Sequence, residues 1–167
     1  MTFESVSNKL IESMQINEQD DIKQLNQEYK NFNDKHYLIF KKGFDKLEML
    51  RQISIEAGMK FQKEFLKFNE YVNDPLLGVL MIQHANACRI TGEIIHLLKG
   101  GYADGAIARW RTLFEIAVTS LVLRKHGKES AIDYIKHGQL KSIEGMEEHQ
   151  KTANAMNVEP FSQEEID

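Results

Sequence analysis

The chain has 167 residues, of which 42% are hydrophobic and 28% charged, and this is the composition of a single globular domain with enough apolar residues to bury a core. The formal net charge of -4 excludes a protein whose whole surface binds polyanions, so any nucleic-acid contact has to be a local patch. With only 10 Gly and 2 Pro, the sequence favours long helices over a β protein with many turns.

The first 34 residues are polar and only weakly periodic, which predicts one or two modest helices in an N-terminal segment. From residue 35 to about residue 71, apolar residues recur every three or four positions, and this spacing predicts a long helix with a break near Gly58. Asp74 and Pro75 then predict a helix start. Asp74 can cap free N–H groups, and Pro75 needs no N–H at the first helical position.

Two helices that end at glycines are predicted next. The first covers residues 75–99, and Gly100 can adopt the left-handed conformation that closes a helix. The second covers residues 103–126 and ends at Gly127. Because the link between them is so short, the two helices are expected to pack antiparallel.

A further helix is expected beyond Gly127, interrupted or loosened near Gly138. Together the elements predict an all-α protein, an antiparallel helical bundle of about five helices. We expect a polar N-terminal helical segment over residues 1–34, a bundle core over residues 35–157 and a polar tail over residues 158–167.

Cysteine usage and the N-terminus indicate a cytoplasmic protein. Cys88 cannot form an internal disulfide and is expected to be a small core residue. The N-terminus lacks the basic start and apolar run of a secretion signal. The most apolar run, residues 113–123, is about half the length that spans a bilayer and contains Glu115. We expect no membrane segment, no metal site and no cofactor.

Two polar stripes carry the candidate site. In the helix over residues 103–126, apolar residues surround the whole circumference, which predicts a buried helix. Arg111 and Glu115, one turn apart on the same face, are therefore expected in or near the interior, with Asp104 on the same stripe. The preceding helix offers a matching polar stripe, formed by Asn86, Arg89, Glu93 and His96.

The facing stripes leave two interpretations open. In the first, Arg89 with Glu93 and Arg111 with Glu115 are intrahelical ion pairs that brace the bundle and fix helix register. In the second, the stripes form a polar cleft in which an arginine holds a phosphate or carboxylate, a glutamate orients it and His96 acts as acid or base. Arg89 and His96 also match the loose Arg-then-His spacing that HEPN bundles (higher eukaryotes and prokaryotes nucleotide-binding) use in metal-free RNA cleavage.

Residues 97–115, LLKGGYADGAIARWRTLFE, resemble the signature of a family of uncharacterised bacterial all-helical proteins. The shared pattern is a leucine-rich helix end, a Gly-Tyr turn and a small-residue helix start that leads to Arg-Thr-Leu-x-Glu, and the match extends over about residues 85–135. The resemblance implies a helical domain of unassigned activity, distantly related to the HEPN bundles of toxin–antitoxin and phage-defence systems. Such chains continue further after the signature, so we expect a fragment or a shortened member.

The function expected from these features is that of a binding or interaction module in a defence or toxin–antitoxin context. We expect it to form a homo-oligomer, and a protein partner is a further hypothesis. The alternative is an HEPN-like metal-independent ribonuclease or nucleotide-modifying toxin, with Arg89 and His96 as catalytic residues and RNA or a nucleotide as its partner. A small-ligand sensor is a third hypothesis. Because no complete catalytic set is visible, enzymatic activity stays open.

Overall fold

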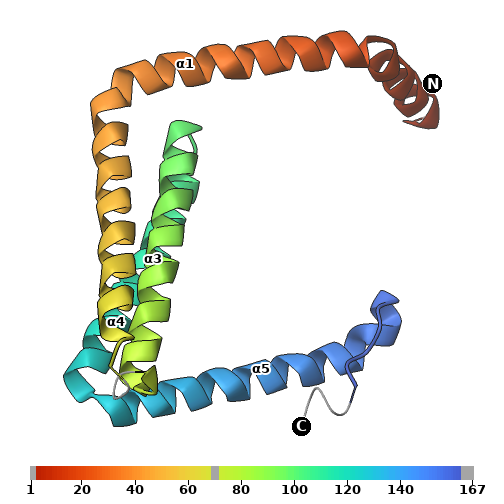
Figure 1. The fold of residues 1–167 in the computed structure, drawn as a ribbon. Helices are drawn as coiled ribbons and strands as arrows, with labels where there is room; N and C mark the ends of the chain where they lie inside the picture. The colour runs from red at the N-terminus through yellow and green to blue at the C-terminus, as the bar shows by residue number, and fades with distance from the viewer. Residues whose placement is uncertain (1–2, 69–71, 163–167) are drawn as a thin grey trace.

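The computed structural model describes residues 3–68 and 72–162, and all regular structure in these ranges is helical (Figure 1). Its four long helices are α1 (Phe3–Phe65), α3 (Pro75–Lys99), α4 (Ala103–His126) and α5 (Lys128–Met156). The all-α prediction is confirmed, but the described residues form four such helices instead of about five. The last residues of the predicted tail, 163–167, lie outside the described ranges, and the division of the chain at residues 34 and 157 stays a prediction.

The helix count differs because α1 is continuous. The prediction of separate N-terminal helices and of a break near Gly58 is wrong, since α1 stays helical from Phe3 to Phe65. Side-chain hydrogen bonds one turn apart support it, such as Gln24 to Glu28 at 2.9 Å and Gln52 to Glu56 at 2.8 Å. Each such pair contributes about 0.2–0.5 kcal/mol. The helix changes direction part-way, so that only its second half runs beside α3 (Figure 1).

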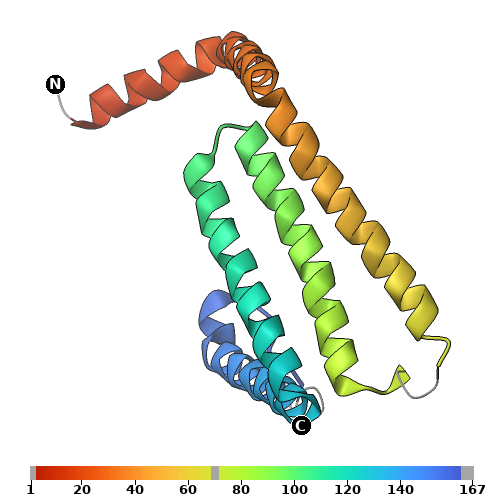
Figure 2. The ribbon, with the colours of Figure 1, turned by 90° about the vertical axis from the view of Figure 1, so that its left-hand side faces the viewer.

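The second half of α1, α3 and α4 lie side by side with α3 in the middle, and neighbouring helices run antiparallel (Figure 2). The antiparallel packing predicted for the two central helices is confirmed. Ile90 and Ile95, the largest fully buried side chains, both belong to the middle helix. Because the three helices form one layer, each outer helix is covered on one face only.

The two ends of α3 follow from particular residues. Asp74 caps the N-terminus as predicted: its Oδ1 accepts hydrogen bonds from the backbone N–H groups of Leu76 at 2.9 Å and Leu77 at 3.2 Å. At the other end, the left-handed residue is Gly101, with φ of 80°, and not Gly100, with φ of -79°. The prediction that placed this conformation at Gly100 is wrong by one residue.

Helix α5 begins directly after Gly127 and runs away from the three-helix layer (Figure 1). It continues through Gly138, so the predicted interruption there is wrong. Its first turns are anchored by the hydrogen bond from Gln83 Nε2 to Tyr134 Oη, 2.7 Å, which satisfies the buried Gln83 side chain. None of the helices in the described residues has the length and hydropathy of a membrane span.

Candidate functional site

A groove of about 990 Å³ runs between the second half of α1 and α3. Most of its wall is apolar, built from Ile55, Ala57, Met59, Phe61, Leu77, Leu80, Met81, Ala85, Cys88 and Ile95. Five basic or titratable nitrogen side chains also line it, namely Arg51, His84, Arg89, His96 and Lys99, against one carboxylate, Glu48. The groove therefore combines an apolar wall with a surplus of positive charge.

Two glycines let side chains of the opposite helix enter the groove wall. A Cβ atom on Gly58 of α1 would lie 2.6 Å from His84 Nε2, and one on Gly92 of α3 would lie 2.9 Å from Arg51 Nε. Both distances are too short for real atoms, so a larger residue at either position would displace the nitrogen side chain that it meets. Gly58, predicted as a helix break, is instead a contact point inside a continuous helix.

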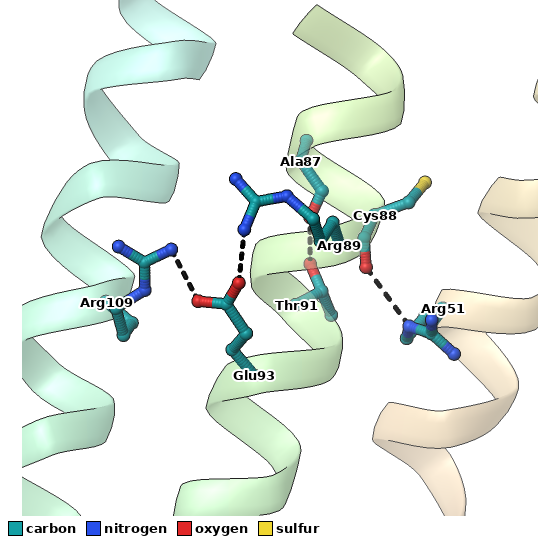
Figure 3. A network of polar contacts seen from close by, with 7 residues as sticks. All are labelled: Arg51, Ala87, Cys88, Arg89, Thr91, Glu93 and Arg109. Atoms are coloured by element: carbon teal, nitrogen blue, oxygen red, sulfur yellow. Dashed lines mark hydrogen bonds and ion pairs between the residues drawn. The ribbon is translucent and has the colours of Figure 1, made fainter. Parts of the chain in front are cut away.

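Arg51 is the basic residue that ties the two walls together. Its Nε donates a hydrogen bond to the backbone oxygen of Cys88, 3.1 Å away, so the guanidinium group of α1 is fixed against α3 (Figure 3). Within the described residues, no carboxylate forms an ion pair with Arg51. Lys99, by contrast, pairs with Glu48 at 2.8 Å. Arg51 thus offers the groove a positive charge that no carboxylate in residues 3–68 and 72–162 neutralises.

Sequence reasoning missed Arg51, although a signal was present. Arg51 stands four residues after Leu47 and four before Ile55, inside the apolar stripe that predicts the helix over residues 35–71. A charged residue at such a position has to lie at the packed face or at its edge. Its partner surface, the backbone at Cys88, could not be read from the spacing.

The predicted polar network forms in part, around Glu93. Glu93 contacts Arg89 on its own helix and Arg109 of α4 (Figure 3). The intrahelical pair of Arg89 and Glu93 is therefore present, while the cross-link to the next helix comes from Arg109 and not from Arg111. Asn86 is half-buried on α3 outside the groove lining.

The remaining predicted residues do not join this network. The Arg111 and Glu115 side chains are 82% and 65% exposed, with Nε and Oε1 3.8 Å apart, and Asp104 is exposed as well. The expectation that these three lie in a buried stripe is wrong, because the single layer of helices leaves one face of α4 uncovered. In α4, whose residues are all described, the buried side chains are Ala106 and Leu123.

Comparison with protein-family models gives a match over residues 77–167 to a family of unknown function, DUF5677. The chain belongs to this family. No curated protein and no solved structure matches it significantly. The family match agrees with the resemblance to uncharacterised proteins, whereas bacterial origin, the Gly-Tyr signature and a relation to HEPN bundles stay predictions.

The DUF5677 match covers α3, α4 and α5 apart from the first two residues of α3. One wall of the groove therefore lies in the family segment, with Arg89 and His96. The other wall, with Arg51, belongs to α1 and lies outside the matched residues. The groove is thus built by pairing the DUF5677 segment with the helix that precedes it in this chain.

The groove of this DUF5677 chain has no arrangement for thiol chemistry. Cys88 Sγ lies 3.6 Å from His84 Nε2, but the same nitrogen lies 2.9 Å from the backbone oxygen of Ser54. A carbonyl oxygen only accepts, so Nε2 carries the proton and cannot take one from the thiol. Among the described residues, no group of three or more His, Cys, Asp or Glu side chains could hold a metal ion.

Proposed function

We propose that this chain is a binding module whose α1–α3 groove takes an organic anion with an apolar body. Arg51 supports this most, because it is a half-buried cation in an apolar groove and has no carboxylate partner among the described residues. A guanidinium group binds carboxylate, sulfonate or phosphate oxygens through two parallel N–H donors. The Arg51 Nε donates its hydrogen bond to the Cys88 backbone oxygen, so the two terminal nitrogens can donate to such a ligand.

The size and wall chemistry of the groove support the same class of ligand. About 990 Å³ is at the upper end of the volumes of small-molecule sites, which are mostly apolar with a few placed polar groups. Apolar contact supplies affinity at roughly 25 cal/mol per Å² buried, and the charge fixes orientation. A neutral ligand of the same shape would leave Arg51 desolvated without a partner, which is unfavourable.

The test uses two fluorescent probes that share one apolar body. Anilinonaphthalene sulfonate carries a negative charge, and phenylnaphthylamine is the same body without the sulfonate. We expect the wild-type chain to bind the sulfonate more tightly than the neutral probe. Arg51→Met should weaken sulfonate binding by at least about tenfold, since one charge-assisted hydrogen bond alone accounts for that loss, and leave phenylnaphthylamine binding unchanged.

The matched control is Arg124→Met, which removes an exposed arginine of α4 outside the groove. It should leave the affinity for both probes unchanged. Equal weakening of both probes by Arg51→Met would mean that the substitution damages the groove walls, and an unchanged sulfonate affinity would remove Arg51 from the site. Either result contradicts the proposal.

A second candidate function, a metal-independent ribonuclease, is favoured by one observation: Arg89 and His96 line the same groove. The assay is cleavage of a single-stranded RNA in the presence of a chelator. Cleavage by the wild-type chain that His96→Ala abolishes, with an unchanged melting temperature, would support this function and the defence context that goes with it. If the wild-type chain does not cleave the RNA, the ribonuclease function is excluded and the binding function remains.

A further inference from the structure

Helix α4 exposes a stripe of large apolar side chains. The stripe, called the α4 stripe below, consists of Ile107, Trp110, Phe114, Val118 and Leu121. Trp110 and Phe114 stack on each other with ring centroids 6.0 Å apart. Exposed apolar patches of this kind mark interaction sites, and tryptophan is among the residues enriched at their centres.

The total surface of the chain also indicates a missing partner. Its accessible surface area is 13604 Å², whereas a compact monomer of 19.3 kDa exposes about 8,500 Å² by the usual scaling of surface with mass. The difference is on the order of 5,000 Å² in one chain, and an obligate homodimer interface, which buries about 2,000–5,000 Å² summed over both subunits, would cover part of it. A partner that covers large apolar faces fits this excess.

The spacing of the α4 stripe shows what kind of partner fits. Its members follow one another at steps of three, four, four and three residues, a series that is the same from either end. Two antiparallel copies of α4, related by a two-fold axis beside Phe114, therefore place Ile107 opposite the partner subunit's Leu121. Trp110 lies opposite the partner subunit's Val118, and the two Phe114 side chains meet at the axis. Such a surface is self-complementary.

The charges beside the stripe fit the same arrangement. Asp104, Arg111 and Glu115 lie along one flank of the stripe at helical spacing, and Lys125 continues the line of Ile107 about five turns on. In the antiparallel pair, Arg111 and the partner subunit's Glu115 differ by two residues in their position along the helix axis. At a rise of about 1.5 Å per residue this offset is about 3 Å. Asp104 lies level with the partner subunit's Lys125 to within about 1.5 Å.

We propose that two copies of this chain form a two-fold symmetric dimer through the α4 stripe, with antiparallel α4 helices and Phe114 at the axis. The interface is separate from the α1–α3 groove, because no stripe residue lines that groove. It also gives Arg111 and Glu115 a role between subunits that they do not have within one chain.

Sedimentation velocity of the full chain tests the dimer. The wild-type chain should sediment with twice the mass of 19.3 kDa, and Phe114→Asp should halve that mass. The matched control is Ile82→Asp on α3, since Ile82 is 63% exposed and Phe114 57%, and Ile82 lies outside the stripe. The control should stay dimeric. A monomeric wild-type chain, or a Phe114→Asp variant that stays dimeric, would overturn the proposal.

Cysteine cross-linking in a Cys88→Ser background tests the geometry and does not depend on Phe114→Asp folding. Phe114→Cys should form a disulfide with its own copy at the axis. Ile107→Cys should not, because its copies lie about 21 Å apart along the helices. Ile107→Cys mixed with Leu121→Cys should cross-link. Self-linking of Ile107→Cys would mean a parallel pair, and failure of both expected cross-links would exclude this interface. Each of these results overturns the proposal.

Discussion

The turn between α3 and α4 depends on one glycine, Gly101. Its φ of 80° lies in the region that other residues enter only with strain, and a Cβ atom there would lie 2.7 Å from the Phe32 ring. Sequence reasoning places a glycine turn at this point correctly. It does not separate Gly100 from Gly101, because both residues are glycines and either can adopt the left-handed conformation.

Gly101→Ala should lower the free energy of unfolding by about 1–2 kcal/mol, the cost of a left-handed conformation for a residue with a side chain. Contact with Phe32 adds to that cost. The control is Gly138→Ala, at a helical position where a Cβ would meet nothing within 4 Å, and this variant should gain about 0.5–1 kcal/mol. Urea unfolding monitored by circular dichroism measures both. Equal effects of the two substitutions would contradict the role given to Gly101.

Asp74 gives the fold a pH dependence of known sign. The hydrogen bond from Lys128 lowers the pKa of the Asp74 carboxyl, the N–H groups of Leu77 and Leu76 lower it further, and burial opposes them. A folded-state pKa below the unfolded value of about 3.9 stabilises the fold above that pH, and the stabilisation is lost as the pH falls through the folded-state pKa.

Asp74→Asn keeps the helix cap but removes the charge, so the variant should be less stable than the wild type at neutral pH. The difference between their urea midpoints should shrink as the pH is lowered below about 4. A difference that stays constant over this range would show that the ionised carboxylate of Asp74 does not contribute.

At the scale of elements, α4 shows the limit of pattern analysis. An all-round apolar pattern predicts a buried helix, and the apolar residues are present, but the described part of the chain covers only one face of α4. Hydrophobic spacing indicates that a face avoids water and does not say whether its own chain or another molecule covers it. For this reason the predicted interior position of Arg111 and Glu115 is wrong.

The ion pairs of α3 and α4 should therefore contribute differently to the free energy of unfolding. Glu93→Ala removes the carboxylate that two arginines share, Arg89 and Arg109, and should lower the free energy of unfolding by about 1 kcal/mol. In the monomeric Phe114→Asp background, Glu115→Ala removes an exposed pair and should change the free energy of unfolding by less than about 0.5 kcal/mol. Thermal unfolding compares them. A larger loss of unfolding free energy for Glu115→Ala than for Glu93→Ala would contradict this account and support the buried position that the sequence predicts for Glu115.

At the scale of the whole molecule, the sequence predicts the helix bounds that capping residues and glycines mark locally. Asp74 with Pro75, and the glycines at 100, 101 and 127, mark the bounds of α3 and α4 closely. The continuity of α1 escapes prediction because its first half is weakly periodic and gains its support from polar pairs. The groove escapes as well, since Arg51 and Cys88 come from different helices and meet only through the antiparallel packing of α1 on α3.

The most direct measurement of ligand binding in the α1–α3 groove is a titration of the chain with anilinonaphthalene sulfonate, observed through methyl resonances of isotope-labelled methionines. Met59 and Met81 line the groove, while Met49 and Met156 are exposed outside it. The account predicts that the Met59 and Met81 resonances shift together in the wild-type chain and shift much less at the same probe concentration in Arg51→Met. Shifts confined to Met49 or Met156 would contradict it.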